Sequence, residues 1–398
     1  MRQPQGYERL GPNGEEMVCR LHRSLYGLKD SPHNWNEELD AWLQGYGLVP
    51  TDADVCVYVM GKADTEGGIL IVLVYVDDLV IVGNVMGTIR GFKQAISSAF
   101  KMKDLGELRW VLGIEVRRDR TRRTLELRQT AYIDRILERF GMGNCHTVAT
   151  PAEVGLQLPR LSGGNGGPNS EYMSLVGSLQ YAATVSRPDI SYIVQVLSRH
   201  LNASGEEHWA AGKRVLRYLK STRTLGIKYS AAGEHALKGY TQLLGYSDAD
   251  WGGDRETRRS TTGYVFKLGG GSVSWGSRLQ QSVALSSTES EYMAACATVQ
   301  EAVHLRRLMK NLGYSQEGAT MIMEDNQGCI ALSENPVNHQ KSKHIDIRYH
   351  FTRERVESKE IKLVYVSTEH QQADLLTKAL GAHRTAYLRD RALGYKID

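Results

Sequence analysis

The stretch Ile69-Leu-Ile-Val-Leu-Val-Tyr-Val-Asp-Asp-Leu-Val-Ile-Val82 places two adjacent carboxylates inside an apolar run. Eight apolar or aromatic residues precede Asp77 and Asp78, and four apolar residues follow them. Branched residues dominate, which predicts two strands of a β-hairpin. A hairpin turn normally uses Asn-Gly, Asp-Gly or Gly, so the two acids gain nothing as turn formers. Beside an apolar sheet their charge is costly unless a cation shares the site, and a divalent metal is the simplest partner.

Two interpretations of Asp77 and Asp78 are open from the residues alone. They are either a solvated acidic turn or a pair that holds Mg²⁺ against phosphates, as in polymerases. The preceding Tyr75 and Val76 and the apolar strands on both sides favour the metal site.

With its hairpin, the chain resembles the reverse transcriptases of copia-type (Pseudoviridae-like) retrotransposons, whose Tyr-Val-Asp-Asp hairpin carries two catalytic acids of the palm. The segment Ser24-Leu-Tyr-Gly-Leu-Lys-Asp-Ser-Pro-His-Asn-Trp35 is similar to a segment of that family. Further motifs follow in the family's order, so the resemblance covers nearly the whole chain. The first of these motifs are at 101–108, 112–116, 187–190, 208–209 and 214–220. Two later ones, Ser247-Asp-Ala-Asp-Trp251 and Ala373-Asp-Leu-Leu-Thr-Lys378, resemble the family's ribonuclease H domain.

Composition is that of a globular protein with two or more cores. The chain has 398 residues, 41% of them hydrophobic and 24% charged. A net charge of +4 does not by itself indicate a nucleic-acid binder. Five scattered cysteines without a Cys-x-x-Cys pair indicate reduced intracellular thiols, not disulfides or a zinc site. No signal peptide is recognisable, and the run at 69–82 is too short to span a bilayer, so we expect no membrane partner.

The predicted fold class is α+β. We expect a truncated reverse-transcriptase palm and thumb portion at 1–150, a linker and helical connection at 151–239, and a ribonuclease H-like α/β domain with a five-stranded mixed sheet at 240–398. The Gly-rich segment 162–170 is the clearest linker. Strands are predicted near 240–247, 261–268, 271–277, 319–323 and 361–366, with helices at 288–312, 326–333 and 343–358 and a last helix from 371.

Four acids of the C-terminal region are predicted where a strand ends or a helix begins: Asp248, Glu291, Asp325 and Asp374. Each alone has an ordinary explanation: Asx turns for Asp248 and Asp325, a capping box with Thr288 for Glu291, and a helix N-terminus for Asp374. Strand ends of one mixed sheet meet at one edge, however, and four carboxylates crowded there need divalent cations.

The family resemblance assigns these four residues the catalytic and metal-binding roles of a ribonuclease H, with Asp250 as a weaker candidate. It implies two Mg²⁺ ions per active site, or Mn²⁺, which activate water and stabilise the leaving oxygen. It also implies Asp77 and Asp78 as catalytic metal ligands of the polymerase.

Nucleic-acid contacts are predicted on a helix where Lys213, Arg217 and Lys220 share one face, with Val215, Leu216 and Leu219 buried behind it. A solvated basic stripe is the alternative. Arg258 and Arg259 are further candidates for phosphate contacts. For the cluster at 117–123, a solvated hairpin tip is at least as good an interpretation. By resemblance, Tyr26, Gly27 and Lys29 are nucleotide-binding.

The chain departs from the family in three places. Met1–Tyr7 resembles an internal stretch, upstream of which the family carries a third palm aspartate and the fingers. Asp30 stands beside the expected nucleotide in place of Gln, where it would repel a triphosphate, and His33 replaces an Arg. The expectation is a fragment of a larger polyprotein or a decaying copy.

The predicted function is therefore that of a retrotransposon reverse transcriptase–ribonuclease H fragment, whose nuclease half is the more competent. Expected partners are an RNA–DNA hybrid, an RNA template with a DNA primer, and deoxynucleoside triphosphates. A dimer, or other Pol-derived chains that supply the missing fingers, is also considered. The expected location is intracellular and reducing, in cytoplasmic particles or the nucleus. The alternative is an inactive or domesticated remnant that at most binds nucleic acid.

Overall fold

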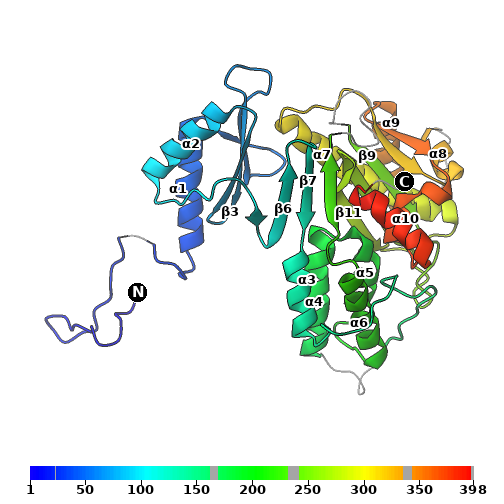
Figure 1. Ribbon diagram of the computed structural model, residues 1–398, viewed down its shortest axis with the longest axis horizontal. Helices are drawn as coiled ribbons and strands as arrows, with labels where there is room; N and C mark the ends of the chain where they lie inside the picture. Colours follow the sequence, from blue (N-terminus) through cyan, green and yellow to red (C-terminus); the bar gives the residue numbers. More distant parts are fainter. Residues whose placement is uncertain (23, 162–168, 232–241, 335–342, 396–398) are drawn as a thin grey trace. The chain divides into compact units, whose positions relative to one another are not determined.

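The computed structural model describes the chain except residues 23, 162–168, 232–241, 335–342 and 396–398 (Figure 1). It forms two compact units: Met1–Asp104 with Asn311–Gly313, and Leu105–Lys310 with Tyr314–Asp398. The division after Asp104 lies earlier than the predicted boundary at 150. The reason is that residues 110–128 belong to a sheet whose strand at 124–128 pairs with a strand at 226–230, inside the second unit. In the part described, no helix is long and apolar enough to cross a membrane.

The first unit is a four-stranded antiparallel sheet with two helices. Its core contains side chains of both helices and of the sheet, including Leu39, Leu43, Leu70 and Phe92. The predicted hairpin is present as β3 and β4, joined by a tight turn in which Tyr75 pairs with Asp78. The elements are α1 Ser31–Tyr46, β1 Val49–Pro50, β2 Val57–Gly61, β3 Ile69–Tyr75, β4 Asp78–Gly83 and α2 Met86–Ala99.

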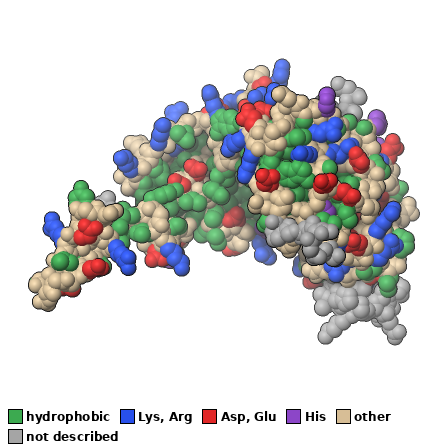
Figure 2. All heavy atoms as spheres, turned by 90° about the horizontal axis from the view of Figure 1, so that it is seen from below, with side chains coloured by type: hydrophobic (Ala, Val, Ile, Leu, Met, Phe, Trp, Pro, Cys, Tyr) green, Lys and Arg blue, Asp and Glu red, His purple; other side chains and the backbone are tan. Residues whose placement is uncertain are grey.

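Some hydrophobic side chains of this hairpin remain exposed. Leu73, Tyr75, Val76 and Val82 are 39–60% exposed. Hydrophobic side chains are visible over much of this unit in Figure 2. The apolar alternation of β3 therefore buries one face against the helices and leaves the other uncovered within the unit.

The second unit begins with another antiparallel sheet. Its first three strands are β5 Trp110–Val111, β6 Ile114–Asp119 and β7 Thr124–Arg128, and β6 and β7 form a hairpin around the basic cluster at 117–123. A fourth strand, β8 Gly226–Ser230, pairs with β7 and was not predicted. Between β7 and β8 lie helices that share one hydrophobic core and gather at one end of the unit in Figure 1. They are α3 Thr130–Arg139, α4 Ser170–Val185, η1 Pro188–Ile190, α5 Ser191–Ser198 and α6 Glu206–Ser221.

The five-stranded mixed sheet is confirmed, with order β11-β10-β9-β12-β13. The pairs β11–β10 and β10–β9 are antiparallel, whereas β12 is parallel to β9 and β13 is parallel to β12. This arrangement is that of a ribonuclease H-like domain. Its strands are β9 Leu244–Ala249, β10 Thr261–Leu268, β11 Gly271–Leu279, β12 Thr320–Glu324 and β13 Ile361–Tyr365; its helices are α7 Ser287–Asn311, α8 Gln327–Glu334, α9 Lys343–Glu357 and α10 Ala382–Leu393.

The prediction of a last helix from 371 is wrong. Two short 3₁₀ turns, η2 Thr368–His370 and η3 Gln372–Leu376, follow β13, and α10 begins only at Ala382. The buried side chain of Gln371 donates to the carbonyl oxygen of Ser247 (2.8 Å) and accepts from the backbone N–H of Ala373 (3.3 Å). This side chain ties the segment to β9, so the local helical pattern is overridden by the tertiary contact. The predicted linker at 162–170 falls largely on residues outside those described.

Candidate active site

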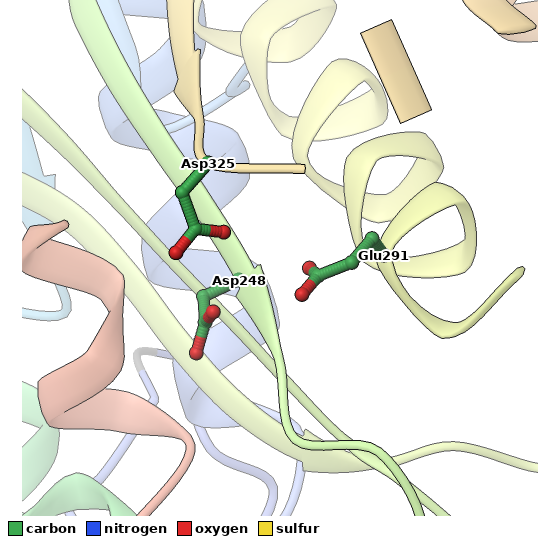
Figure 3. A group of neighbouring side chains, drawn as sticks. All are labelled: Asp248, Glu291 and Asp325. Atoms are coloured by element: carbon green, nitrogen blue, oxygen red, sulfur yellow. The ribbon is translucent and has the colours of Figure 1, made fainter. Parts of the chain in front are cut away.

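Three of the four predicted nuclease acids lie together. Asp248 is on β9, Glu291 is in the second turn of α7, and Asp325 directly follows β12. One carboxylate oxygen from each lies within 4.8 Å of the others (Figure 3). Because β9 and β12 are parallel neighbours, their carboxyl ends reach the same edge of the sheet, where the N-terminal part of α7 adds Glu291.

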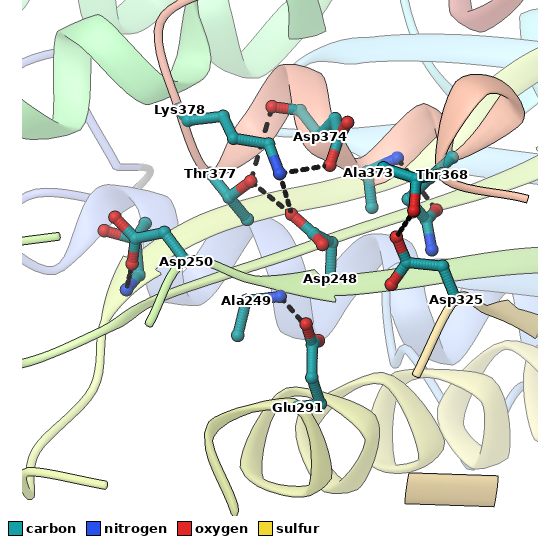
Figure 4. A network of polar contacts seen from close by, with 12 residues as sticks. Asp248, Ala249, Asp250, Glu291, Asp325, Thr368, Ala373, Asp374, Thr377 and Lys378 are labelled. Atoms are coloured by element: carbon teal, nitrogen blue, oxygen red, sulfur yellow. Dashed lines mark hydrogen bonds and ion pairs between the residues drawn. The ribbon is translucent and has the colours of Figure 1, made fainter. Parts of the chain in front are cut away.

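Each of these acids is held by a hydrogen bond from another part of the unit (Figure 4). The backbone N–H of Ala249 donates to Glu291 Oε2 at 2.8 Å, and Thr368 Oγ1 donates to Asp325 Oδ2 at 2.7 Å. The hydroxyl of Thr377 donates to Asp248 Oδ2. The acids are therefore positioned by the fold and do not act as local turn formers.

The alternative of a capping box between Glu291 and Thr288 is not realised. Glu289 takes that role instead: its Oε2 accepts from the backbone N–H of Leu285 at 2.8 Å, and its own N–H donates to Ser286 Oγ at 3.2 Å. Glu291 is thus free to face the sheet edge.

Asp374 stands apart from the group of three. It lies in η3 and is 1% exposed, with Lys378 Nζ at 2.6 Å from Oδ1 and Arg384 Nη2 paired with Oδ2. Lys378 Nζ is also 3.7 Å from Asp248 Oδ2, so this lysine bridges the two aspartates (Figure 4). The structure therefore brings Asp374 beside Asp248, but with cations of the chain already next to it.

Burial and mutual repulsion dominate the electrostatics of the group. Burial, with Asp374 and Asp325 adding repulsion, raises the pKa of Asp248 to about 7 against the opposing effect of Lys378. The pKa of Glu291 is raised by burial and then by Asp248. Burial alone would lower the pKa of Lys378, but Asp248 and Asp374 outweigh it and raise the value to about 12. Such mutual destabilisation of carboxylates favours a cation between them.

One acid of this region was missed. Glu324, the last residue of β12, has no exposed surface, and burial raises its pKa well above the ordinary range. Its Oε1 accepts from the backbone N–H of Asn326 at 3.2 Å, whereas Oε2 has no hydrogen-bond partner among the described residues. The signal in the sequence was a charged residue ending an otherwise apolar strand directly before Asp325.

The weaker candidate Asp250 does not join the group (Figure 4). Its carboxylate accepts from the backbone N–H of Thr261, and burial raises its pKa to about 6. It therefore connects β9 to β10 at the edge of the site.

The donors of the three-acid group fit a hard divalent cation. They are carboxylate oxygens only, which suit Mg²⁺ or Mn²⁺ and do not suit thiophilic metals. Within the residues that the structure describes, this is the only group of three such ligand atoms. This set of carboxylates therefore fits the Mg²⁺ or Mn²⁺ that is expected from the sequence.

The hairpin acids have a different environment. Asp77 and Asp78 are exposed at the turn. The preceding Val76 adopts a left-handed φ of 55°, which is strained for a β-branched residue, and its carbonyl oxygen accepts from Trp35 Nε1 at 2.8 Å. In the described part of the chain, no third acid joins them within metal-binding distance.

The predicted nucleotide-binding residues lie in the segment before α1. Tyr26 is 97% exposed, Lys29 is exposed, and Gly27 has a φ of 92°. Their predicted role stays a prediction. The same holds for Arg258, which is exposed with a φ of 57°, and for the half-buried Arg259.

The basic face of α6 has structural contacts that were not predicted. Arg217 Nε donates to the carbonyl oxygen of His146 at 2.7 Å, and Lys220 Nζ donates to that of Cys145 at 2.8 Å. Lys213 Nζ lies 5.4 Å from the centre of the Trp209 ring. Two of the three cations therefore attach the connection after α3 to α6, and phosphate binding by this face stays a prediction.

Comparison with known proteins finds one family match in the N-terminal part of the chain and transposon relatives over most of its length. The family described as reverse transcriptase (RNA-dependent DNA polymerase) matches residues 1–154. The Retrovirus-related Pol polyprotein from transposon TNT 1-94 of Nicotiana tabacum is 42% identical over 386 residues, covering 96% of this chain and 28% of that protein. A putative transposon Ty5-1 protein of Saccharomyces cerevisiae is 31% identical over 302 residues, covering 76% of this chain and 94% of that protein.

Among solved structures, the ribonuclease H1 of Halobacterium salinarum NRC-1 is 17% identical, with 34% of this chain and 94% of that chain covered and a TM-score of 0.25. The ribonuclease H-like fold of this domain is defined by the strand order described above.

The palm-like hairpin and the acidic sheet edge thus define a reverse transcriptase-related protein with a ribonuclease H-like domain. The chain belongs to the Pol proteins of copia-type retrotransposons. It spans about a quarter of the length of the Pol polyproteins that it matches first, 28% and 25%.

Proposed function

We propose that the second unit hydrolyses the RNA strand of RNA–DNA hybrids. The observation that carries this proposal is the meeting of Asp248, Glu291 and Asp325 at one edge of a ribonuclease H-like sheet. Three buried or half-buried carboxylates without a cation would repel one another, so their juxtaposition is best explained by a cation-dependent reaction.

These three carboxylates would hold Mg²⁺ or Mn²⁺. When bound, such ions lower the pKa of a water molecule and stabilise the leaving oxygen of a phosphodiester. The protein's own contribution is positional: Ala249, Thr368 and Thr377 fix the acids in place, so little reorganisation is needed during reaction. Glu324 is buried directly before Asp325, and burial raises its pKa, which favours its uncharged form in the absence of a nearby cation.

RNA-directed DNA synthesis is the second candidate function. It is favoured by the exposed Asp77–Asp78 turn and by the reverse transcriptase family match over residues 1–154. Its partners would be an RNA template, a DNA primer and deoxynucleoside triphosphates, and a dimer or other Pol-derived chains could complete the site. We expect this 398-residue polypeptide alone not to extend a primer, because no third acid joins the hairpin pair in its described part. Extension that Asp77→Asn abolishes would contradict this expectation.

The nuclease is tested with a labelled RNA–DNA hybrid at millimolar Mg²⁺ or Mn²⁺. The wild-type chain should cleave RNA, and Asp248→Asn or Asp325→Asn should reduce the rate by about 10²–10³-fold or more. Asp64→Asn, at an exposed turn of the first unit, is the matched control and should leave cleavage unchanged. A folded protein that leaves the hybrid intact would support the alternative of an inactive or domesticated remnant that binds nucleic acid at most.

A further inference from the structure

Lys378 lies between two of the acids at the candidate active site. Its Nζ is 2.6 Å from Asp374 Oδ1 and 3.7 Å from Asp248 Oδ2 (Figure 4). No comparable cation of the chain is paired with Glu291 or Asp325 among the described residues, where backbone and hydroxyl donors make the contacts. Asp374 and Asp248 therefore share a cation of the chain, whereas Glu291 and Asp325 are held only by uncharged donors among the described residues.

The charges around Asp374 are already balanced from within the chain. One of its oxygens pairs with Lys378 and the other with Arg384, whose guanidinium also donates to the carbonyl oxygen of Thr368. A divalent ion approaching Asp374 would meet two positive charges within a few ångströms. An ion approaching the group of three acids would meet mainly negative charge.

Lys378 is more exposed than the two acids that it bridges. Its side chain is 40% exposed, whereas those of Asp248 and Asp374 are 3% and 1% exposed. A lysine ammonium on a flexible stem can exchange its carboxylate partners for water at modest cost when it is near the surface. The two acids are buried, whereas their lysine partner reaches the surface.

From this arrangement we infer that Lys378 competes with the second divalent ion of the site. One ion binds to Asp248, Glu291 and Asp325 with high affinity, and another binds beside Asp374 only when Lys378 moves away. This inference rests on the proposed function, since it assumes that the acids bind a catalytic cation. It makes Lys378 a positioning residue that sets how many ions the site holds at a given concentration.

The test is a Mn²⁺ titration of the full 398-residue chain, with free Mn²⁺ followed by electron paramagnetic resonance and folding checked by circular dichroism. The wild type should take up one ion tightly and a second more weakly. Lys378→Met should tighten the second ion by about tenfold or more, because it removes a nearby positive charge. Lys362→Met, on the exposed side of β13, makes the same change in charge away from the acids and should match the wild type.

The outcomes separate the two proposals. Two equally tight ions in the wild type, unchanged in Lys378→Met but reduced in Asp248→Asn, would overturn the role of Lys378 and leave the metal site standing. Wild-type protein that binds no Mn²⁺, or binds it equally after Asp248→Asn, would overturn the proposed function itself. If Lys378→Met does not fold, the same Mn²⁺ titration is made with Lys378→Gln. The number of ions bound by the wild type and the affinity of the second ion in Lys378→Gln are then judged by the same criteria.

Discussion

Arg187 and Asp189 form an ion pair from which solvent is fully excluded. Arg187 Nε and Nη2 donate to the two oxygens of Asp189 at 2.9 and 2.6 Å, and both side chains are 0% exposed. Tyr218 donates its hydroxyl to Asp189 at 2.7 Å, and Arg187 Nη1 donates to the carbonyl oxygen of Thr222 at 3.1 Å. Burial alone would raise the pKa of Asp189, but Arg187 and Tyr218 outweigh it and lower that pKa. The motif 187–190 thus connects η1 to α6.

Removing one partner of this pair should be strongly destabilising. Asp189→Ala leaves the Arg187 charge buried and unpaired, which should cost about 3–5 kcal/mol of unfolding free energy. Asp134→Ala breaks the exposed pair with Arg223 and should cost less than about 1 kcal/mol. Urea denaturation followed by circular dichroism measures both. Equal small losses would show that the buried pair is not needed for folding of the helical connection.

The hydrogen bond from Thr368 to Asp325 should matter for catalysis more than for stability. Thr368→Val keeps the side-chain shape but removes the donor at 2.7 Å, so Asp325 is less well oriented. Loss of such supporting hydrogen bonds typically reduces metal affinity or activity about 10–100-fold. Hybrid cleavage and Mn²⁺ affinity are the measurements, with Thr65→Val in the first unit as control. Unaltered affinity and rate would mean that Asp325 is held by other contacts.

Glu324 should make the metal-free protein less stable as pH rises. Its folded-state pKa lies above its ordinary value of 4.5, so its stability contribution is present below about pH 4.5 and is lost as pH increases. In EDTA, Glu324→Gln should therefore raise the melting temperature by at least about 2 °C at pH 8 and by less at pH 5. Calorimetry measures this, and the exposed Glu317→Gln is the control. A lower melting temperature for Glu324→Gln at pH 8 would contradict the electrostatic argument.

His200 should make the helical connection sensitive to acid. Its ring centre is 4.3 Å from that of His208, and burial, then His208 and Arg199, lower its pKa from 6.5 to about 4. The unfolded chain therefore binds a proton between these values while the folded chain does not, so the contribution is present above about pH 6.5 and is lost as pH falls toward 4. Arg160 opposes protonation and Asp254 favours it.

His200→Gln removes this titration. Between pH 7 and 5, the melting temperature of the variant should fall less than that of the wild type. His383→Gln, at an exposed position of α10, should retain the wild-type slope. Parallel slopes for all three proteins would show that His200 titrates alike in the folded and unfolded states.

Much of the fold follows from local pattern. The hairpin around Asp77 and the alternation of strands and helices after residue 240 were predictable because each element has its own hydrophobic period. What failed depended on contacts between distant residues. The strand β8 is short and takes its place only by pairing with β7, and the segment after Gln371 is held by carbonyl groups of β9.

The same distinction applies to the site. The proximity of Asp248 and Asp325 was predictable because ends of adjacent parallel strands meet at one edge, whereas Glu291 on α7 was expected there from the family resemblance. Lys378 is four residues after Asp374, a spacing that allows an ion pair, but its second partner Asp248 is remote in sequence. The charge of Glu324 was visible, whereas its complete burial depends on the packing of the whole domain.

The pairing of β7 with β8 has a consequence for how the protein is made. Leu127 pairs with Ile227, one hundred residues later in the chain. At roughly 5–20 residues per second, β7 leaves the ribosome about 5–20 s before its partner strand exists. During that interval its open edge can pair with other chains, so β6 and β7 carry the early risk of aggregation. Slower translation between residues 128 and 226 should lengthen this interval and lower the yield of soluble protein.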